Sequence, residues 1–290
     1  MDRFKDRVAA ITGAASGIGL ALAERAADEG MTVVMADVEA TALERAAKSV
    51  RGRSANVVAQ RLDVTDEDAV EAFASRVFSE FGAVHMLCNN AGVLNRERPA
   101  WEHSIADWRW VLNVNLRGVI HGVRAFVPRM LASGQEGHIV NTASMAGLIT
   151  GGIGTAVYDA SKHAVLSFTE SLYRDLAIST SKVSASVLCP GVVTTNIFTA
   201  ERNRPADLDP AEGAIPESRV TTAFPASSFD PSEVVTQVFD AVREKRFYIL
   251  ASQPVIFEWT KMGHDRMWEG KNPAVPRHLI AAREAAEAAQ

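Results

Sequence analysis

Tyr158 and Lys162, two side chains with complementary acid–base chemistry, lie four residues apart. If one helix carries both, they project from the same face about one turn apart. The ordinary pKa of a tyrosine phenol is about 10, and a nearby positive charge favours the ionised form. Tyr158 is therefore a candidate proton donor and acceptor near neutral pH, and Ser144 could add a hydroxyl to the same pocket. The alternative for the pair alone is a core tyrosine beside a solvated lysine.

A glycine-rich turn near the start of the chain indicates nucleotide binding. Gly13, Gly17 and Gly19 follow the short apolar run 8–11 and precede a helical pattern. A strand, a glycine turn and a helix bring backbone N–H groups and a positive helix end close to a pyrophosphate. The spacing is G-x-x-x-G-x-G rather than the commoner G-x-G-x-x-G. A plain tight turn is the alternative for the glycines alone.

The identity of the nucleotide depends on Asp37, which ends the apolar segment 32–36. An acidic group at this position accepts hydrogen bonds from the adenosine ribose and repels a 2′-phosphate. Neither Val38, which follows it, nor Ala15 in the glycine turn is basic. NAD is therefore the predicted cofactor, with NADP disfavoured. The same carboxylate could also cap a helix that starts near residue 39.

Apolar segments and helical patterns alternate along the chain. We expect strands at 8–11, 32–36, 57–62, 84–88, 137–141, 183–189 and 247–250, and later helices at 39–50, 66–81, 107–132, 156–177 and 231–244. Strands that are apolar almost throughout predict a parallel sheet buried on both faces. Within 107–132, Asn115 competes for backbone hydrogen bonds, and Pro128 could kink or end the helix.

We expect one domain over residues 1–290. The segment at about 196–229 contains four prolines and follows the sixth strand, so we interpret it as a substrate lid, with a surface insertion as the alternative. A C-terminal extension at about 251–290 contains scattered tryptophans and methionines, which suggest an amphipathic helix.

The composition excludes several classes of function. The net charge of -5 and the lack of a basic tract give no reason to expect nucleic-acid binding. No apolar run reaches 18 residues, so no membrane span is expected, and a cytoplasmic location is the default. Cys88 and Cys189 end apolar runs and are expected to be buried free thiols. No metal site is predicted.

Taken together, these residues resemble the short-chain dehydrogenase/reductase family in its single-domain branch. The matching positions, in unbroken order from residue 7 to about 195, are Thr12-Gly13-x-x-x-Gly17-x-Gly19, Asp63-Val64, Asn89-Asn90-Ala91-Gly92, Asn115, Ser144, Tyr158-x-x-x-Lys162 and Pro190-Gly191 with Thr195. The resemblance implies an α/β fold: a Rossmann-type, doubly wound, seven-stranded parallel sheet of order 3-2-1-4-5-6-7 with helices on both faces. It also implies a homo-oligomer, either a tetramer or a dimer.

The resemblance further implies roles for individual residues. Tyr158 would be the general acid or base, and Lys162 would lower its pKa and bind the nicotinamide ribose. Ser144 would position the substrate oxygen, and Asn115 would hold a water that connects Lys162 to solvent. The implied cofactor-binding set is Gly13, Ser16, Gly17, Ile18, Gly19, Asp37, Val38, Asp63, Val64, Asn90, Ala91, Gly92, Tyr158, Lys162, Pro190, Gly191, Val193 and Thr195.

The leading prediction is an NAD-dependent oxidoreductase for bulky hydrophobic secondary alcohols or ketones. Candidate substrate-facing residues are apolar: Met145, Ala146, Ile149, Val157, Ile197 and Phe198. One alternative is an NADP-dependent carbonyl reductase of the acyl or polyketide type, against which Asp37 argues. A second alternative is a non-catalytic NAD-binding regulatory protein, which would be expected to lack part of the catalytic set.

Overall fold

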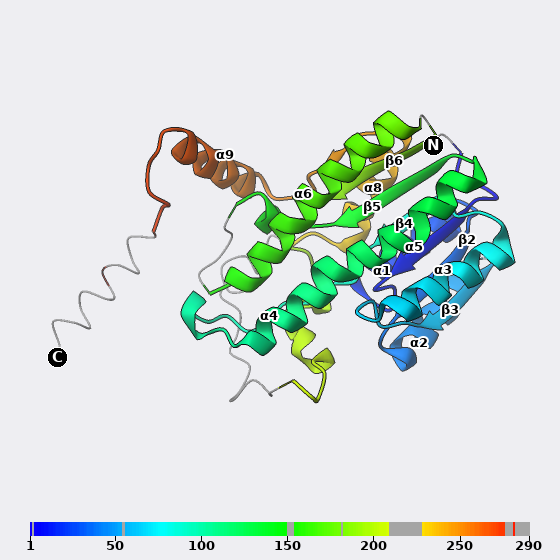
Figure 1. Cartoon of the computed structure of the whole chain (residues 1–290), viewed down its shortest axis with the longest axis horizontal. Coiled ribbons are helices and arrows are strands. Elements are labelled where there is room, and N and C mark those ends of the chain that lie inside the picture. Colours follow the sequence, from blue (N-terminus) through cyan, green and yellow to red (C-terminus); the bar gives the residue numbers. More distant parts are fainter. Residues whose placement is uncertain are drawn as a thin grey trace. The chain divides into compact units, whose positions relative to one another are not determined.

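A computed structural model of the chain describes residues 1, 3–53, 56–149, 154–180, 182–208, 228–275 and 281. Within these residues, one sheet has seven strands in the order β3-β2-β1-β4-β5-β6-β7, all paired in parallel (Figure 1). The strands are β1 (Val8–Thr12), β2 (Thr32–Asp37), β3 (Val57–Arg61), β4 (Met86–Asn89), β5 (Gly137–Thr142), β6 (Val183–Leu188) and β7 (Tyr248–Ile249). The predicted Rossmann-type sheet and its strand order are confirmed.

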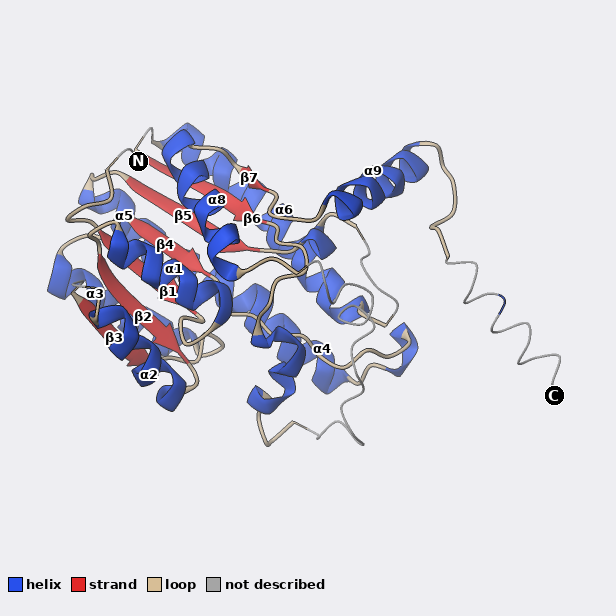
Figure 2. Ribbon diagram, turned by 180° about the vertical axis from the view of Figure 1, so that it is seen from behind, coloured by secondary structure: helices blue, strands red, loops and turns tan. Residues whose placement is uncertain are grey.

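Helices cover both faces of the sheet because successive strand residues point to opposite sides. Ala9 and Ile11 of β1 face one apolar cluster, whereas Val8 and Ala10 face the other. Figure 2 shows helices on the two sides of the sheet. The first cluster includes α1 (Gly17–Asp28), α2 (Ala40–Arg51) and α8 (Pro231–Glu244), and the second includes α3 (Glu67–Phe81), α5 (Gly118–Ser133) and α6 (Ala156–Ser179).

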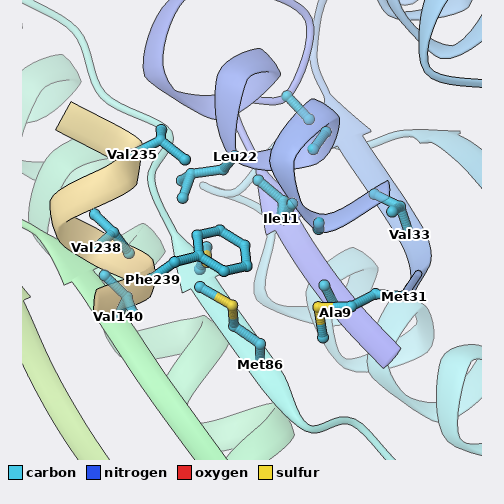
Figure 3. Close-up of a cluster of buried hydrophobic side chains, with 14 of the residues drawn as sticks. Ala9, Ile11, Leu22, Met31, Val33, Met86, Val140, Val235, Val238 and Phe239 are labelled. Carbon is cyan, nitrogen blue, oxygen red and sulfur yellow. The ribbon is translucent and has the colours of Figure 1, made fainter. Parts of the chain in front are cut away.

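Large side chains fill the space between helices and strands in the first cluster. Phe239 of α8 packs with Leu22 of α1 and Met86 of β4, and all three are buried (Figure 3). Close packing of this kind makes the strands rigid. The loops that leave their carboxyl ends therefore have defined positions relative to one another.

The helix predicted over 107–132 is interrupted in the structure. α4 (Ile105–Leu112) passes into a π-helical turn, η2 (Asn113–Arg117), and then into α5. The expected disturbance at Asn115 is therefore present. Pro128 lies inside α5, which continues to Ser133, so the idea that this proline ends the helix is wrong. A helix tolerates the one missing N–H when its apolar face is buried, as the α5 face is in the second cluster.

The segment after β6 is not an irregular loop throughout. It begins with a 3-10 helix, η4 (Asn196–Asn203), and Phe229 pairs with Val193 at its other end. Residues 209–227 of the predicted lid lie outside the described residues.

Met1–Gln253 forms one compact unit and Pro254–Gln290 another. The second unit contains α9 (Pro254–Trp268), which confirms the helix predicted in the C-terminal extension. The single domain over residues 1–290 stays a prediction. None of the helices in the described part of the chain has the length and apolarity that a membrane crossing requires.

A buried histidine in β5 makes the fold sensitive to acid. The Nε2 atom of His138 lies 2.7 Å from Ser186 Oγ. Burial lowers the pKa of His138 to about 3, with smaller contributions from the N-terminal amine and Lys245. Because the unfolded chain takes up this proton near pH 6.5 and the folded protein does not, acid favours unfolding below that pH.

We expect His138 to remove about 2 kcal/mol from the free energy of unfolding between pH 7 and pH 5. Urea denaturation of wild type and His138→Asn at both pH values measures this contribution. The variant should lose less stability on acidification, whatever its absolute stability. An equal pH dependence in the two proteins would contradict the assignment.

Candidate active site

The three side chains expected to do chemistry meet at the carboxyl end of β5. Tyr158 and Lys162 lie in the first two turns of α6, and the Lys162 Nζ atom is 5.6 Å from the centroid of the Tyr158 ring. The side chain of Ser144 lies close enough to the Tyr158 hydroxyl to lower the pKa of the phenol. Ser144 caps the 3-10 helix η3 (Met145–Gly147) and accepts a hydrogen bond from the Ala146 N–H at 3.1 Å. The tyrosine, lysine and serine are thus brought together as predicted.

Lys162 is buried, and its Nζ donates a hydrogen bond to the Thr142 carbonyl at 2.9 Å. Gly92 lies beside it: a Cβ at that position would be 3.4 Å from Lys162 Nζ and 3.5 Å from Asn115 Oδ1. The loop after β4 therefore passes close to both side chains. Thr142 is a partner of Lys162 that sequence reasoning did not identify.

Asn115 ties the loop after β4 to the helix of Tyr158. Its Oδ1 accepts from the Val93 N–H at 2.8 Å, and its Nδ2 donates to the Val93 carbonyl and to Ser161 Oγ, each at 3.0 Å. The π-helical turn places this buried amide where both contacts are possible. This clamping role was not anticipated from the sequence, and the expected water-holding role stays a prediction.

The glycine turn lies against loops from other strands. A Cβ on Gly19 would lie 2.0 Å from the Gly13 carbonyl oxygen, and one on Gly13, whose φ is +67°, would lie 2.9 Å from Ala91 Cα. A Cβ on Gly17 would lie 2.9 Å from the Cγ2 atom of Thr195. A side chain at any of these glycines would force the turn away from the neighbouring loops. Without side chains, the backbone of the turn can approach a pyrophosphate closely.

Thr12, which precedes the turn, holds the neighbouring loop in place. Its Oγ1 accepts hydrogen bonds from the N–H groups of Asn90 and Ala91 at 3.0 and 3.1 Å. Thr12 belongs to the motif in the sequence, but we did not expect it among the site residues. It aligns two of the expected cofactor-binding segments side by side.

Asp37 lies at the end of β2, next to the same turn. Its Oδ2 accepts from the Ala15 N–H at 2.9 Å, and its Oδ1 accepts from the Glu39 N–H at 3.0 Å. Burial raises the pKa of Asp37, although these backbone hydrogen bonds oppose the shift. The N-cap of α2 is Glu39 and not Asp37. A carboxylate at this end of β2 fits the ribose of a dinucleotide.

The remaining cofactor candidates lie on neighbouring loops. Asp63 accepts from the Thr65 N–H at 2.9 Å, and the Val64 carbonyl is 2.9 Å from His121 Nδ1. The Pro190 carbonyl accepts from the Met145 N–H at 2.9 Å, which links the loop after β6 to that after β5. The residues present therefore fit a dinucleotide lying along the carboxyl edge of the sheet.

A sequence model of the short chain dehydrogenase family matches residues 7–206. The chain belongs to the short-chain dehydrogenase/reductase family. It is similar to 1-deoxy-11-beta-hydroxypentalenate dehydrogenase of Streptomyces exfoliatus, with 40% identity over 86% of this chain and 84% of that protein. It is also similar to the CLA biosynthesis dehydrogenase/reductase of Lactiplantibacillus plantarum, with 33% identity over 86% and 89% of the two chains.

Among solved structures, a short-chain dehydrogenase/reductase from Burkholderia phymatum in complex with NAD is 42% identical, with a TM-score of 0.89, over 95% of this chain and 99% of that one. This short-chain dehydrogenase is therefore an oxidoreductase that acts on hydroxyl or keto groups.

In this dehydrogenase, the protein surroundings of Tyr158 raise the pKa of its phenol. Desolvation raises the pKa of Tyr158 to about 12, the side chain of Ser144 opposes this shift, and Asp159 and Cys189 add to it. Desolvation also lowers the pKa of Lys162 to about 8. Without a cofactor, desolvation therefore decides the direction of the shift in the pKa of Tyr158. That Lys162 lowers this pKa once the cofactor is bound stays a prediction.

The expected substrate-facing residues fall into two groups. Val157 is fully buried in an apolar cluster with Trp110 and Ala200, so it has no solvent contact in this structure, and its substrate-facing role stays a prediction. Successive helix residues are rotated by about 100°, which turns Val157 away from the Tyr158 face. Met145 is also buried, whereas the remaining candidates keep some solvent contact: Ala146, Ile149, Ile197 and Phe198.

Proposed function

We propose that this protein is an NAD-dependent dehydrogenase that interconverts a bulky hydrophobic secondary alcohol and its ketone. The observation that carries the proposal is the grouping of Tyr158, Ser144 and buried Lys162 beside the glycine turn. A phenol, a hydroxyl and an amine in a desolvated site are suited to moving one proton at a substrate oxygen.

Each of these residues has a distinct task. Tyr158 takes the proton from the alcohol during oxidation and returns it during ketone reduction, while Ser144 holds the substrate oxygen. A nicotinamide cofactor, when bound, supplies the hydride acceptor or donor. Because the pKa of Tyr158 is raised, its phenol is protonated at neutral pH and ready for reduction. Oxidation requires the ionised form and is therefore expected to speed up as the pH rises.

Asp37 supports NAD as the cofactor, because its carboxylate would lie close to the 2′-phosphate of NADP and repel it. No basic residue flanks Asp37 to offset this repulsion. The similar protein from Burkholderia phymatum forms a complex with NAD, which is consistent with this proposal. We expect wild type to bind NADH more tightly than NADPH. In Asp37→Asn, removal of the charge should shift the ratio of the two affinities about tenfold towards NADPH.

Fluorescence titration of both cofactors measures these affinities, with Asp28→Asn, at the end of α1, as the control. Tighter binding of NADPH by the wild type would favour the alternative, an NADP-dependent carbonyl reductase.

The substrate class is supported by the partly exposed apolar side chains of Ile149, Ile197 and Phe198. A panel of aliphatic, alicyclic, aromatic and steroid secondary alcohols, followed by NADH formation, tests it. Turnover of the bulkier apolar members is expected. Activity only on small polar alcohols would contradict the proposal.

We also propose that the protein is a homo-oligomer, either a tetramer or a dimer. Exposed apolar side chains on α5 and α6, namely Leu131, Tyr173 and Ile178, support an interface there. Light scattering coupled to size exclusion measures the mass, and a monomer at micromolar concentration would contradict the proposal. The cytoplasmic location stays a prediction.

A further inference from the structure

Residues 195–204, here called the strap, connect two parts of the molecule that are distant in sequence. The strap contains η4 and lies beside α4 (yellow-green in Figure 1). Arg202 and Asn203 contact Glu39 in the loop after β2, whereas Arg204 contacts Asp107 in α4. Arg202 thus attaches the strap to Glu39, and Arg204 attaches it to Asp107.

The attachment at Asp107 is buried. Arg204 Nη1 donates to Asp107 Oδ1 at 2.7 Å, and the two side chains are only 6% and 9% exposed. Glu201 Oε1 lies 3.6 Å from the same Nη1, and the guanidinium lies 5.4 Å from the centroid of the Trp110 ring. Burial alone would raise the pKa of Asp107, but hydrogen bonds from Arg204 and Ser104 outweigh it and lower the pKa. Separating this pair would leave buried charges unpaired, so this attachment is firm.

The attachment at Glu39 is far more accessible. Arg202 Nη2 donates to Glu39 Oε1 at 2.7 Å, and the side chains are 36% and 31% exposed. Asn203 Nδ2 donates to the same oxygen at 2.9 Å. The hydrogen bond from Arg202 is the main reason why the pKa of Glu39 is lowered, so this carboxylate is charged at neutral pH. An exposed pair of this kind contributes little to stability and is weakened by salt.

The accessible attachment at Glu39 borders the expected cofactor site. The Glu39 N–H donates to Asp37 Oδ1 at 3.0 Å, which places the pair next to the expected adenosine-ribose carboxylate. At the start of the strap, the Thr195 side chain lies against Gly17 in the glycine turn. The strap therefore contacts the glycine turn, which is expected to bind the pyrophosphate, and Glu39, which adjoins the carboxylate expected to bind the ribose.

We propose that Glu39 and Arg202 are positioning residues that hold the strap closed beside the cofactor, so that opening of this pair sets the rate of cofactor release. The buried Arg204–Asp107 pair stays formed while the exposed Glu39–Arg202 pair opens. This inference rests on the proposed function, because it requires the dinucleotide to bind along Gly17 and Asp37.

The test compares Glu39→Gln, Arg202→Gln and the double variant with wild type. NADH dissociation is followed by stopped-flow fluorescence after displacement with excess NAD. Each single variant should release NADH about two- to fivefold faster, and the double variant should release it no faster than either single one. Raising the ionic strength should accelerate release from wild type but not from the variants.

Asp28→Asn is the matched control, because Asp28 forms a similarly exposed ion pair with Arg53 away from the site. If wild type binds NADH and the variants release it at the wild-type rate, the Glu39–Arg202 pair does not control release. That result would overturn this proposal and leave the proposed function intact. Wild type that binds neither NADH nor NADPH would overturn the proposed function.

Hydrogen exchange measured without cofactor tests whether the Glu39–Arg202 pair holds the strap closed, whether or not the protein binds NADH. Amides of residues 195–204 should exchange faster in Glu39→Gln than in wild type and Asp28→Asn. Equal exchange in the three proteins would overturn the proposal.

Discussion

Replacement of Tyr158 by phenylalanine is expected to lower kcat/KM for the alcohol about 10²–10⁴-fold, because it removes only the hydroxyl that exchanges the proton. The ring remains on α6, so the packing around it and the binding of NADH should change little. Steady-state kinetics in both directions and NADH titration measure the two effects separately.

Tyr173→Phe is the matched control for this substitution, since Tyr173 lies on the same helix but packs against Phe247. It should retain wild-type activity. If Tyr158→Phe kept more than about a tenth of the activity, Tyr158 would not be the general acid or base, because the expected contribution is at least about 10²-fold.

Replacement of Lys162 by methionine is expected to reduce kcat/KM by about 10²-fold or more and, at the same time, to stabilise the fold. The activity falls because the positive charge near Tyr158 is lost. The stability rises because burial of the ammonium, which lowers the pKa of Lys162 to about 8, costs free energy in the native state. After subtraction of the lost hydrogen bond to Thr142, the expected gain in unfolding free energy at pH 7 is about 1–2 kcal/mol.

The sign of the stability effect follows from the two protonation states of Lys162. Below pH 8 both the folded and the unfolded chain carry the proton, and the full penalty applies. Between pH 8 and 10.5 the folded protein releases the proton first, and the penalty disappears. Urea denaturation at pH 7 and pH 10 should therefore show that the advantage of Lys162→Met shrinks at the higher pH.

The matched control is Lys182→Met, because Lys182 also donates to a backbone carbonyl, that of Gly134, but is exposed to solvent. It should change neither activity nor the pH dependence of stability by much. A Lys162→Met protein that is less stable than wild type at pH 7 would show that the buried charge is not a net cost.

Much of the fold could be predicted because its determinants are local. Nearly unbroken apolar strands such as β5 require covering on both faces, and helical segments between them make the strands parallel. The glycine turn and the spacing of Tyr158 and Lys162 are also local features. The disturbance at Asn115 was expected from its side chain, but its hydrogen bonds to Val93 join segments 22 residues apart and could not be derived from the pattern.

The direction of the pKa shift at Tyr158 illustrates the limit of sequence reasoning. Four-residue spacing places an amine near a phenol, but it says nothing about the solvent that the fold removes from both. Val157 shows the same limit, since an apolar residue beside the tyrosine could face either a pocket or the core. Only the packing of α4, η4 and α6 shows that it lies in an apolar cluster in this structure.

The amino-acid sequence was enough to predict the glycine turn, the family resemblance with its strand order, and the set of residues that meet around Tyr158. How those residues are charged and held depends on the tertiary structure. Burial raises the pKa of Tyr158, and Thr142 accepts the hydrogen bond of Lys162. The fold also joins Arg202 to Glu39 across 163 residues. Desolvation and long-range ion pairs depend on which segments the folded chain brings together, and no local pattern encodes that.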